Sequence, residues 1–153
     1  MRKVLLALAA SMAVASPALA NEARVEGRGG VIWDNGDEEA IGGVAVGYDF
    51  DLGSSAFVGA EISADKILTD NTRVSFGFGG RAGVKVSEAG KLYAAGSYQT
   101  KPCALCEDSW TLGAGYQHNL GNNLYGKVEY RHYFVDNGVS DPDAVTVGLG
   151  MRF

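Results

Sequence analysis

Residues 145–153 alternate strictly between apolar side chains and small or polar ones, and this alternation limits what the segment can form. Successive side chains of a β-strand point to opposite faces, so a period of two divides the segment into an apolar face and a polar face. The apolar face carries Val145, Val147, Leu149, Met151 and Phe153, and the other face carries Thr146, Gly148, Gly150 and Arg152. The segment therefore predicts a strand with one side suited to an apolar environment and the other to a polar one.

Residues 1–20 predict a secretory signal peptide. Arg2 and Lys3 precede a short apolar run, and the stretch then ends in small residues with the A-x-A pattern of a cleavage site. A membrane-anchoring helix is the alternative, but the apolar run is shorter than the roughly 20 residues that span a bilayer. We expect residues 1–20 to be removed and residues 21–153 to form one domain.

The charge of the remaining chain excludes one class of partner. Without the signal segment the chain has 11 basic and 18 acidic residues, a formal net charge of −7. Binding to nucleic acid needs a basic patch that displaces counterions, so we expect no nucleic-acid partner. Glycine is abundant and proline rare, and the glycines lie inside the alternating segments as well as between them. This composition favours a closely packed β-protein.

Alternation of the same kind recurs along the rest of the chain. The segments lie at 23–33, 40–50, 56–64, 73–86, 92–99, 110–118, 124–134 and 144–153. Their regular spacing, with turn signals between them, is typical of an all-β fold, an eight-stranded antiparallel up-and-down β-barrel. Longer, mostly acidic connections alternate with tight turns. The longer ones are Asp34–Glu39, Asp65–Thr72, Thr100–Ser109 and Val135–Asp143, and the tight ones are Asp51–Ser55, Ser87–Lys91 and Asn119–Asn123.

The period of two alone leaves two environments open for these strands. In segment 124–134, Val128 and Tyr130 fall on one face, and Lys127 and Glu129 fall on the other. A soluble sandwich would bury the apolar face against a second sheet, whereas a membrane barrel turns that face to lipid and the charges to the lumen. Segment lengths near the roughly 9–11 residues of a tilted membrane strand favour the barrel, as do two belts of aromatic residues. The belts are Trp33, Trp110 and Phe134 near the longer loops, and Tyr48, Phe50 and Phe153 near the tight turns.

An exported chain whose alternating last segment ends on Phe153 resembles the small eight-stranded β-barrel families of the bacterial outer membrane. These are the outer-membrane-protein β-barrel domain and the opacity-like porins, and the resemblance covers residues 21–153. It implies a monomeric barrel in the bacterial outer membrane, in contact with outer-membrane lipids and lipopolysaccharide. It also implies that Phe153 is a C-terminal assembly signal for the barrel assembly machinery.

The polar faces of the strands predict a filled lumen. An eight-stranded barrel has an interior just wide enough for its own side chains, and charges buried there must be paired. The charged candidates are Arg24, Glu26, Arg28, Glu61, Arg81, Lys85, Lys127, Glu129, Arg131 and Arg152. The glycines interleaved with them are Gly59, Gly77, Gly79, Gly83, Gly113 and Gly115. Paired acids and bases, with glycines making room, would close the lumen, and a narrow porin-like channel is the alternative.

Cys103 and Cys106 lie in the third of the longer loops. An exported chain meets an oxidising compartment, so the pair predicts a local disulfide that stiffens this loop. Haem attachment would need His where Glu107 stands, zinc would lack two of its ligands, and no βαβ pattern suggests thioredoxin-like chemistry.

The acidic run Asp34–Glu39 raises the question of a bound cation. Several carboxylates close together suit Ca²⁺ or Mg²⁺, but this run lacks the spacing of an EF-hand loop. We interpret it as a solvated surface and expect no metal centre. Acidic outer loops approach anionic lipopolysaccharide favourably only with divalent ions between them, so diffuse cation binding is compatible with this interpretation.

His132 raises an enzymatic alternative. Its expected outward position near the end of a strand resembles the lipid A deacylase family, in which a lipid-facing His works with a Ser two residues on and an acidic partner. Phe134 stands where that family has its Ser, Ser140 lies in a loop, and Glu129 lies on the opposite face. A His base without a nucleophile makes no triad. No GxSxG, HExxH or Walker motif is present, so we predict neither enzymatic activity nor a cofactor.

The sequence thus predicts an outer-membrane barrel with a structural, envelope-integrity or surface-interaction role through acidic outer loops. A narrow channel, a lipid A-modifying enzyme and a soluble periplasmic β-domain are the alternatives. The loops carry no motif that names a ligand.

Overall fold

The structure is a computed structural model and describes residues 21–135 and 140–153. The predicted signal peptide lies outside the described residues. The strands are β1 (Glu22–Asp34), β2 (Asp37–Leu52), β3 (Ala56–Ile67), β4 (Ser75–Lys85), β5 (Gly90–Gln99), β6 (Ser109–Asn119), β7 (Leu124–Val135) and β8 (Asp143–Arg152). Within these two ranges, no helix is long and apolar enough to cross a membrane.

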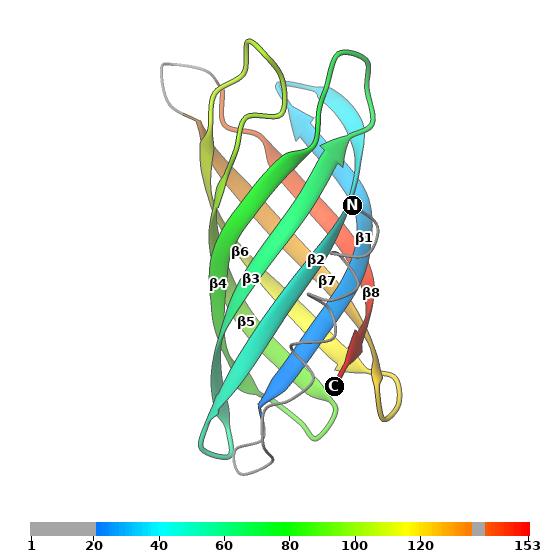
Figure 1. Cartoon of the computed structure of the whole chain (residues 1–153), viewed down its shortest axis with the longest axis vertical. Helices are drawn as coiled ribbons and strands as arrows, with labels where there is room; N and C mark the ends of the chain where they lie inside the picture. The colour runs from blue at the N-terminus through cyan, green and yellow to red at the C-terminus, as the bar shows by residue number, and fades with distance from the viewer. Residues whose placement is uncertain (1–20, 136–139) are drawn as a thin grey trace, which may run out of the picture.

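The strands form one closed antiparallel barrel, in which each strand pairs with its neighbours in the sequence (Figure 1). The barrel closes where β1 pairs with β8, in a register that places Arg24 opposite Arg152. At the end of this ladder, Ala23 and Phe153 exchange two backbone hydrogen bonds of 3.1 and 2.9 Å. Closure leaves no free strand edge, because every strand has a partner on both sides. This confirms the predicted eight-stranded up-and-down barrel.

The β1–β2 hairpin corrects one of the predicted loops. β1 continues to Asp34 and β2 begins at Asp37, so only Asn35 and Gly36 connect them. Both connecting residues have positive φ angles, 49° and 99°, as a two-residue type I′ turn requires. Asn-Gly is the dipeptide that favours this turn most strongly. The acidic residues after the turn therefore extend β2 beyond the segment predicted for it and do not form a loop.

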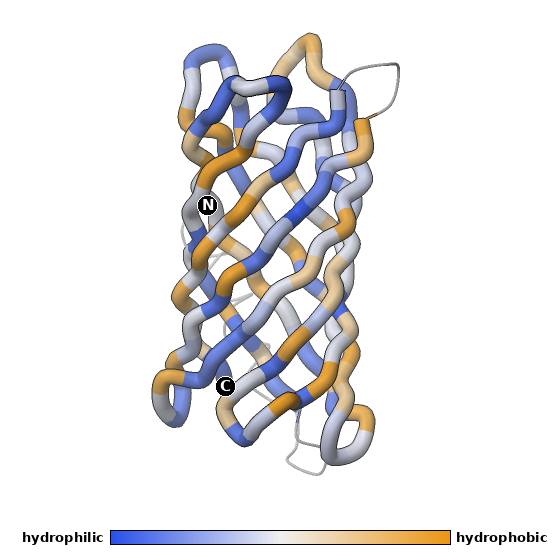
Figure 2. The backbone as a smooth tube through the Cα atoms, turned by 180° about the vertical axis from the view of Figure 1, so that it is seen from behind, coloured by the Kyte–Doolittle hydropathy of each residue, from blue (hydrophilic) through white to orange (hydrophobic). Residues whose placement is uncertain are grey.

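Apolar side chains cover the outside of the barrel, and polar side chains fill the inside. Phe76 and Phe78 of β4 are each 51% exposed, whereas Arg81 of the same strand is 4% exposed. Figure 2 shows hydrophobic and hydrophilic positions alternating along the tilted strands. In water this arrangement would expose a large apolar surface while burying charge, so the barrel is suited to lipid outside. It argues against the alternative of a soluble periplasmic β-domain.

Aromatic side chains mark both ends of the apolar surface. At the end with the longer loops, the upper end in Figure 1, Trp110 packs edge-on against Tyr98 with ring centroids 5.4 Å apart. Trp110 also lies opposite Phe134 in the β6–β7 ladder. At the end with the tight turns, the rings of Tyr48 and Phe50 are 4.8 Å apart. Aromatic rings prefer membrane–water interfaces, and longer loops face outward in such barrels, so we call the two ends the outer and the inner end.

Candidate functional site in the lumen and the outer mouth

Acidic and basic side chains on the inner faces of the strands form one connected ion-pair network. Its acids are Glu22, Glu26, Asp49, Glu61, Asp65 and Glu129, and its bases are Arg24, Arg28, Arg81, Lys91, Lys127 and Arg131. Arg152 joins this network at the inner rim through Glu22, so the network has six acids and seven bases. The pairing matters because breaking a buried ion pair leaves an uncompensated charge, at a cost of roughly 3–5 kcal/mol.

Asp49 lies at the centre of the inner half of this network. Its carboxylate is fully buried and accepts hydrogen bonds of 3.0 and 2.5 Å from Nε and Nη2 of Arg81. Lys91 Nζ lies 3.6 Å from the same carboxylate. The Arg81 guanidinium also stacks over the ring of Tyr93, 4.8 Å from the centroid. Because these residues come from β2, β4 and β5, they span the lumen from one wall to another.

Glu26 and Glu129 connect β7 to β1 and β5 within the network. Glu129 pairs with Arg131, and its Oε2 lies 3.3 Å from Lys127 Nζ. The Tyr93 hydroxyl donates a 2.8 Å hydrogen bond to the same oxygen of Glu129. Lys127 Nζ lies 2.5 Å from Glu26 Oε1, which links β7 to β1. All five residues are buried, so these polar contacts are shielded from bulk water.

Two arginines of β1 connect the network to β3. Nε and Nη2 of Arg28 donate to the two carboxylate oxygens of Asp65 at 2.9 and 2.6 Å, a geometry that matches the planar guanidinium to the carboxylate. Glu61 accepts hydrogen bonds from Nη1 of Arg28 at 3.1 Å and from Nη1 of Arg24 at 2.7 Å. Each β1 arginine therefore has a carboxylate partner on β3, the second strand along the barrel.

Most of the charged residues predicted for the lumen meet in this network. They are Arg24, Glu26, Arg28, Glu61, Arg81, Lys127, Glu129 and Arg131. Lys85 lies apart from them, at the inner end, where its Nζ is 2.5 Å from Asp51 and its side chain is 28% exposed. Arg152 also lies at the inner end, with Nη1 3.1 Å from Glu22 Oε2. The network thus ends at the inner rim, and Lys85 and Asp51 form a separate rim pair.

Sequence reasoning missed five members of this cluster, namely Glu22, Asp49, Asp65, Lys91 and Tyr93. Glu22 lies one residue before the predicted segment 23–33 but belongs to β1. Asp65 and Lys91 fall in predicted connections, but they belong to β3 and β5 in the structure. Counting in steps of two from the neighbouring inward residues would have found both. Asp49 and Tyr93 lie inside predicted strands, on the inward phase of β2 and β5, and their signal is the same period of two.

Glycines make room for these large polar groups. A side chain at Gly59 would collide with the Asp49 carboxylate, and one at Gly115 would collide with the Tyr93 hydroxyl. A gap beside Glu61 has a volume of about 20 Å³. A cavity of roughly 10–15 Å³ is needed to hold one water molecule, so this gap is of water size. In the part of the chain that the structure describes, side chains therefore close the lumen, which argues against a narrow porin-like channel.

An apolar layer covers the charges at the outer end. Ile32, Ile41 and Ala144 are buried there, and Ile67 and Tyr133 pack against them. Beyond this layer the barrel opens into a cavity of about 280 Å³, which we call the mouth cavity. Residues of the outer strand ends and of the β5–β6 and β7–β8 connections line it.

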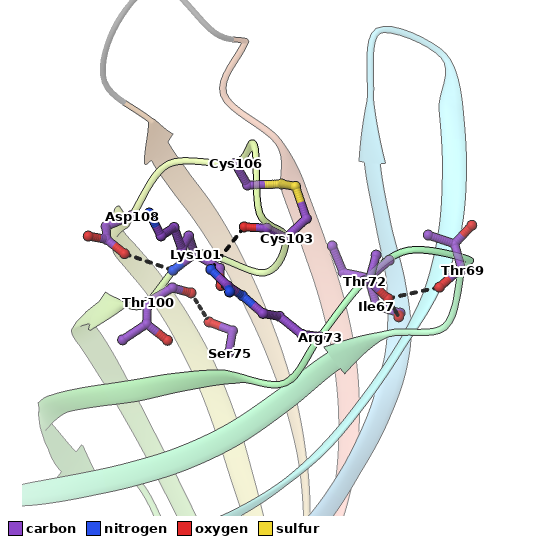
Figure 3. Close-up of a disulfide and its surroundings, with 10 residues drawn as sticks. All are labelled: Ile67, Thr69, Thr72, Arg73, Ser75, Thr100, Lys101, Cys103, Cys106 and Asp108. Atoms are coloured by element: carbon purple, nitrogen blue, oxygen red, sulfur yellow. Dashed lines mark hydrogen bonds between the residues drawn. A yellow bond between two sulfur atoms is a disulfide. The ribbon is translucent and has the colours of Figure 1, made fainter.

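The β5–β6 loop forms part of the wall of the mouth cavity. Cys103 and Cys106 form the predicted disulfide in this loop. Arg73, from the β3–β4 connection, donates hydrogen bonds to the carbonyl oxygens of Lys101 and Cys103 at 3.3 and 3.0 Å. The Lys101 amide donates to Asp108 at 2.8 Å, which closes the base of the loop (Figure 3). A covalent bridge and a neighbouring loop thus hold this segment in place.

His132 faces outward, as predicted, and has an acidic partner that sequence reasoning missed. Its Nδ1 lies 2.7 Å from Oδ1 of Asp143, the residue opposite it in the β7–β8 ladder. The imidazole packs edge-on against the ring of Phe134, with centroids 4.6 Å apart. The Ser140 hydroxyl donates to Asp34 and not to the imidazole. The Tyr130 hydroxyl donates a hydrogen bond to the same oxygen of Asp143. The outer surface therefore carries a Tyr–Asp–His group in which, among the described residues, no serine hydroxyl is bonded to the imidazole.

The acidic hairpin residues Asp37, Glu38 and Glu39 are exposed at the outer rim. Over residues 21–135 and 140–153, no group of three or more His, Cys, Asp or Glu side chains is arranged to hold a metal ion. The rim is therefore a diffuse negative surface in the structure.

Several solved structures share this architecture. Neisserial surface protein A aligns with a TM-score of 0.58 at 10% identity, over 87% of this chain and 97% of that chain. Ail of Yersinia pestis aligns with a TM-score of 0.57 at 14% identity, over 87% and 98% of the two chains. The N-terminal β-barrel domain of Pseudomonas aeruginosa OprF aligns with a TM-score of 0.58 at 11% identity, over 86% and 97%. At these identities the likeness concerns the fold alone, and none of the curated proteins compared with the chain matches it.

Sequence similarity to a protein family is more specific than this likeness of fold. The family described as outer membrane protein beta-barrel domain matches residues 6–153, a span that contains every strand of the barrel. The apolar outer surface and the paired charges inside agree with that match. The chain therefore belongs to the outer membrane protein beta-barrel domain family and is a protein of the bacterial outer membrane.

Proposed function

We propose that this protein is a closed, non-enzymatic barrel that supports envelope integrity by holding an acidic rim against the lipopolysaccharide layer. The filled lumen is the observation that carries the proposal. A connected ion-pair network occupies the interior, and the gap beside Glu61 is only of water size. Since the interior is occupied by its own side chains, the outer rim and the lipid-facing surface remain for interaction.

The outer rim carries an excess of acidic side chains. The exposed acids there are Asp37, Glu38, Glu39, Asp70, Glu107, Asp108 and Asp141, and the exposed bases are Lys66, Arg73 and Lys101. Lipopolysaccharide is itself anionic, so direct contact with this rim is repulsive. Mg²⁺ and Ca²⁺ bind carboxylate and phosphate oxygens together, and they would bridge the two surfaces.

The charge of the rim also bears on which ligands to expect. Ail has been crystallised with the heparin analogue sucrose octasulfate. A polyanion of this kind would be repelled by the rim described above. We therefore propose divalent cations, and not sulfated sugars, as the direct ligands of the rim.

Two further partners are proposed from the outer-membrane location. The apolar outer surface would contact outer-membrane lipids, and the seam between β1 and β8, where Phe153 bonds to Ala23, would be closed by the barrel assembly machinery. A closed barrel presents no unpaired strand edge to a second copy, which supports a monomer.

Conductance and lipopolysaccharide binding test the proposal separately. In planar bilayers the wild-type protein should give little steady conductance. In nanodiscs it should bind lipopolysaccharide in the presence of Mg²⁺ and release it when EDTA is added. The Asp37→Asn/Glu38→Gln/Glu39→Gln variant should weaken this binding, whereas Glu88→Gln, an exposed acid at the inner end, should not. A steady open channel, or binding that ignores both EDTA and the rim variant, would overturn the proposal.

A further inference from the structure

The mouth cavity has apolar walls, and the proposed contact with lipopolysaccharide does not use it. Ile32, Ile41 and Ile67 line its inner part, and Tyr133 and Leu105 also contribute to its walls. Its volume of about 280 Å³ is close to the lower end of the roughly 300–1,000 Å³ of small-molecule sites. The mouths of β-barrels are among the preferred places for such sites. The size therefore suits a small molecule and not a polymer.

Leu105 is an apolar side chain held at the edge of this cavity. It is 97% exposed, and it lies between Cys103 and Cys106, which form the disulfide. The hydrogen bonds from Arg73 to the same loop keep it next to the β3–β4 connection. A single exposed leucine is ordinary on a protein surface, but one that borders an apolar cavity is covered once the cavity is occupied. The disulfide and the Arg73 hydrogen bonds therefore hold Leu105 at the edge of the cavity.

Among the described residues, the charged side chains that line the mouth cavity are all acidic. They are Asp34, Asp65 and Glu107, and no lysine or arginine of the described residues lines the cavity. Asp65 is already paired with Arg28. Asp34 accepts a hydrogen bond from the neutral hydroxyl of Ser140, and Glu107 is exposed. Asp34 and Glu107, which have no basic partner among the described residues, therefore lie at the edge of an apolar cavity.

We propose that the mouth cavity binds a small amphipathic cation, an apolar ring or short chain that bears one ammonium group. The apolar part would displace water from the isoleucine-lined wall, and the ammonium group would meet the carboxylates of Asp34 and Glu107. A neutral analogue keeps the apolar contact and loses the ion pairs, and an anionic analogue is repelled by the same carboxylates. We therefore expect the mouth cavity to bind the cation most tightly, the neutral analogue less tightly and the anion least tightly. This order does not depend on what the rim binds.

The isoleucines of the chain provide reporters for the experiment. Ile32, Ile41 and Ile67 line the mouth cavity, whereas Ile62 is 51% exposed on the outer surface and reports partition into lipid. The protein, labelled at its isoleucine methyl groups in nanodiscs of zwitterionic lipid, is titrated with tryptamine, 3-ethylindole and indole-3-propionate. Tryptamine should shift the three cavity methyl signals and leave Ile62 unchanged. The neutral 3-ethylindole should bind about fivefold more weakly, the loss expected for two partly exposed ion pairs, and indole-3-propionate more weakly still.

Two matched double variants separate a local contact from the overall charge of the rim. Asp34→Asn/Glu107→Gln should weaken tryptamine about fivefold and leave 3-ethylindole unchanged. Asp37→Asn/Glu38→Gln removes the same charge from exposed positions that do not line the cavity, and it should leave both affinities unchanged. Shifts confined to Ile62, equal affinities for the three probes, or equal losses in the two double variants would each overturn the proposal.

Discussion

The Tyr93 hydroxyl donates a 2.8 Å hydrogen bond to Glu129 from β5 to β7, past the strand that separates them in the barrel. The same carboxylate pairs with Arg131 and Lys127. Glu129 is 2% exposed, so these donors replace the water that a carboxylate would otherwise bind. The residue therefore ties two walls of the barrel together through the lumen.

Glu129→Ala should lower the free energy of unfolding by about 3–5 kcal/mol, because it leaves Arg131 and Lys127 buried without their shared partner. Unfolding in urea, followed by tryptophan fluorescence of protein in lipid vesicles, measures this change. Lys85→Ala is the matched control. Lys85 pairs with Asp51 at the inner rim with a 28% exposed side chain, so its loss should cost at most about 1 kcal/mol. Equal losses in both variants would contradict a lumen shielded from water.

The strands could be predicted wherever bulky apolar side chains repeat at a period of two. In β7 the exposed Val128 and Tyr130 and the buried Lys127 and Glu129 lie on the predicted faces. The pattern fails where acidic residues continue a strand beyond the apolar surface, as at the start of β2. There the Asn35–Gly36 turn is the better guide, because its backbone geometry fixes the hairpin regardless of the side chains around it.

The pairing inside the lumen could not be predicted from the same period. Arg81 and Asp49 lie on β4 and β2, with β3 between them, and they meet because the tilt and stagger of the strands bring them to the same level. The sequence shows which residues face inward but not which ones meet. The mouth cavity was missed for a similar reason, because residues of separate connections, such as Leu105 and Ser140, come together there.

Phe153 should be needed for assembly. Its amide donates to the Ala23 carbonyl at 2.9 Å, and its ring is 67% exposed at the inner end of the barrel. Phe153→Asp places a charge in the inner aromatic belt, so we expect lower outer-membrane levels and more periplasmic degradation. Phe153→Tyr keeps an interfacial ring and should be tolerated. Equal amounts of wild type and the Asp variant in fractionated membranes, both running as compact unheated species on a detergent gel, would contradict this expectation.

The base of the β5–β6 loop should loosen in acid. The hydroxyl of Tyr98 and the backbone amide of Lys101 donate to the Asp108 carboxylate and hold its pKa below the usual value. The stabilisation is therefore complete above the unfolded pKa of about 3.9 and is lost as the pH falls through the lower pKa of the folded loop. The Lys101 amide shift, followed by NMR below about pH 5, should change in that range. Asp108→Asn should remove this pH dependence, and an unchanged shift in the wild type would count against the loop contact.

The pair of His132 and Asp143 should be structural. Asp143 would orient the His132 imidazole as a general base. However, Phe134 occupies the position of the serine that a deacylase of this type uses. We expect mass spectrometry of lipid A incubated with the wild-type protein to show no loss of acyl chains. His132→Ala should leave the acylation pattern and the heat-dependent gel mobility unchanged. Deacylation by the wild type that disappears in His132→Ala would overturn the non-enzymatic assignment, and Ser140→Ala would then test the nearest hydroxyl in the connection that follows β7.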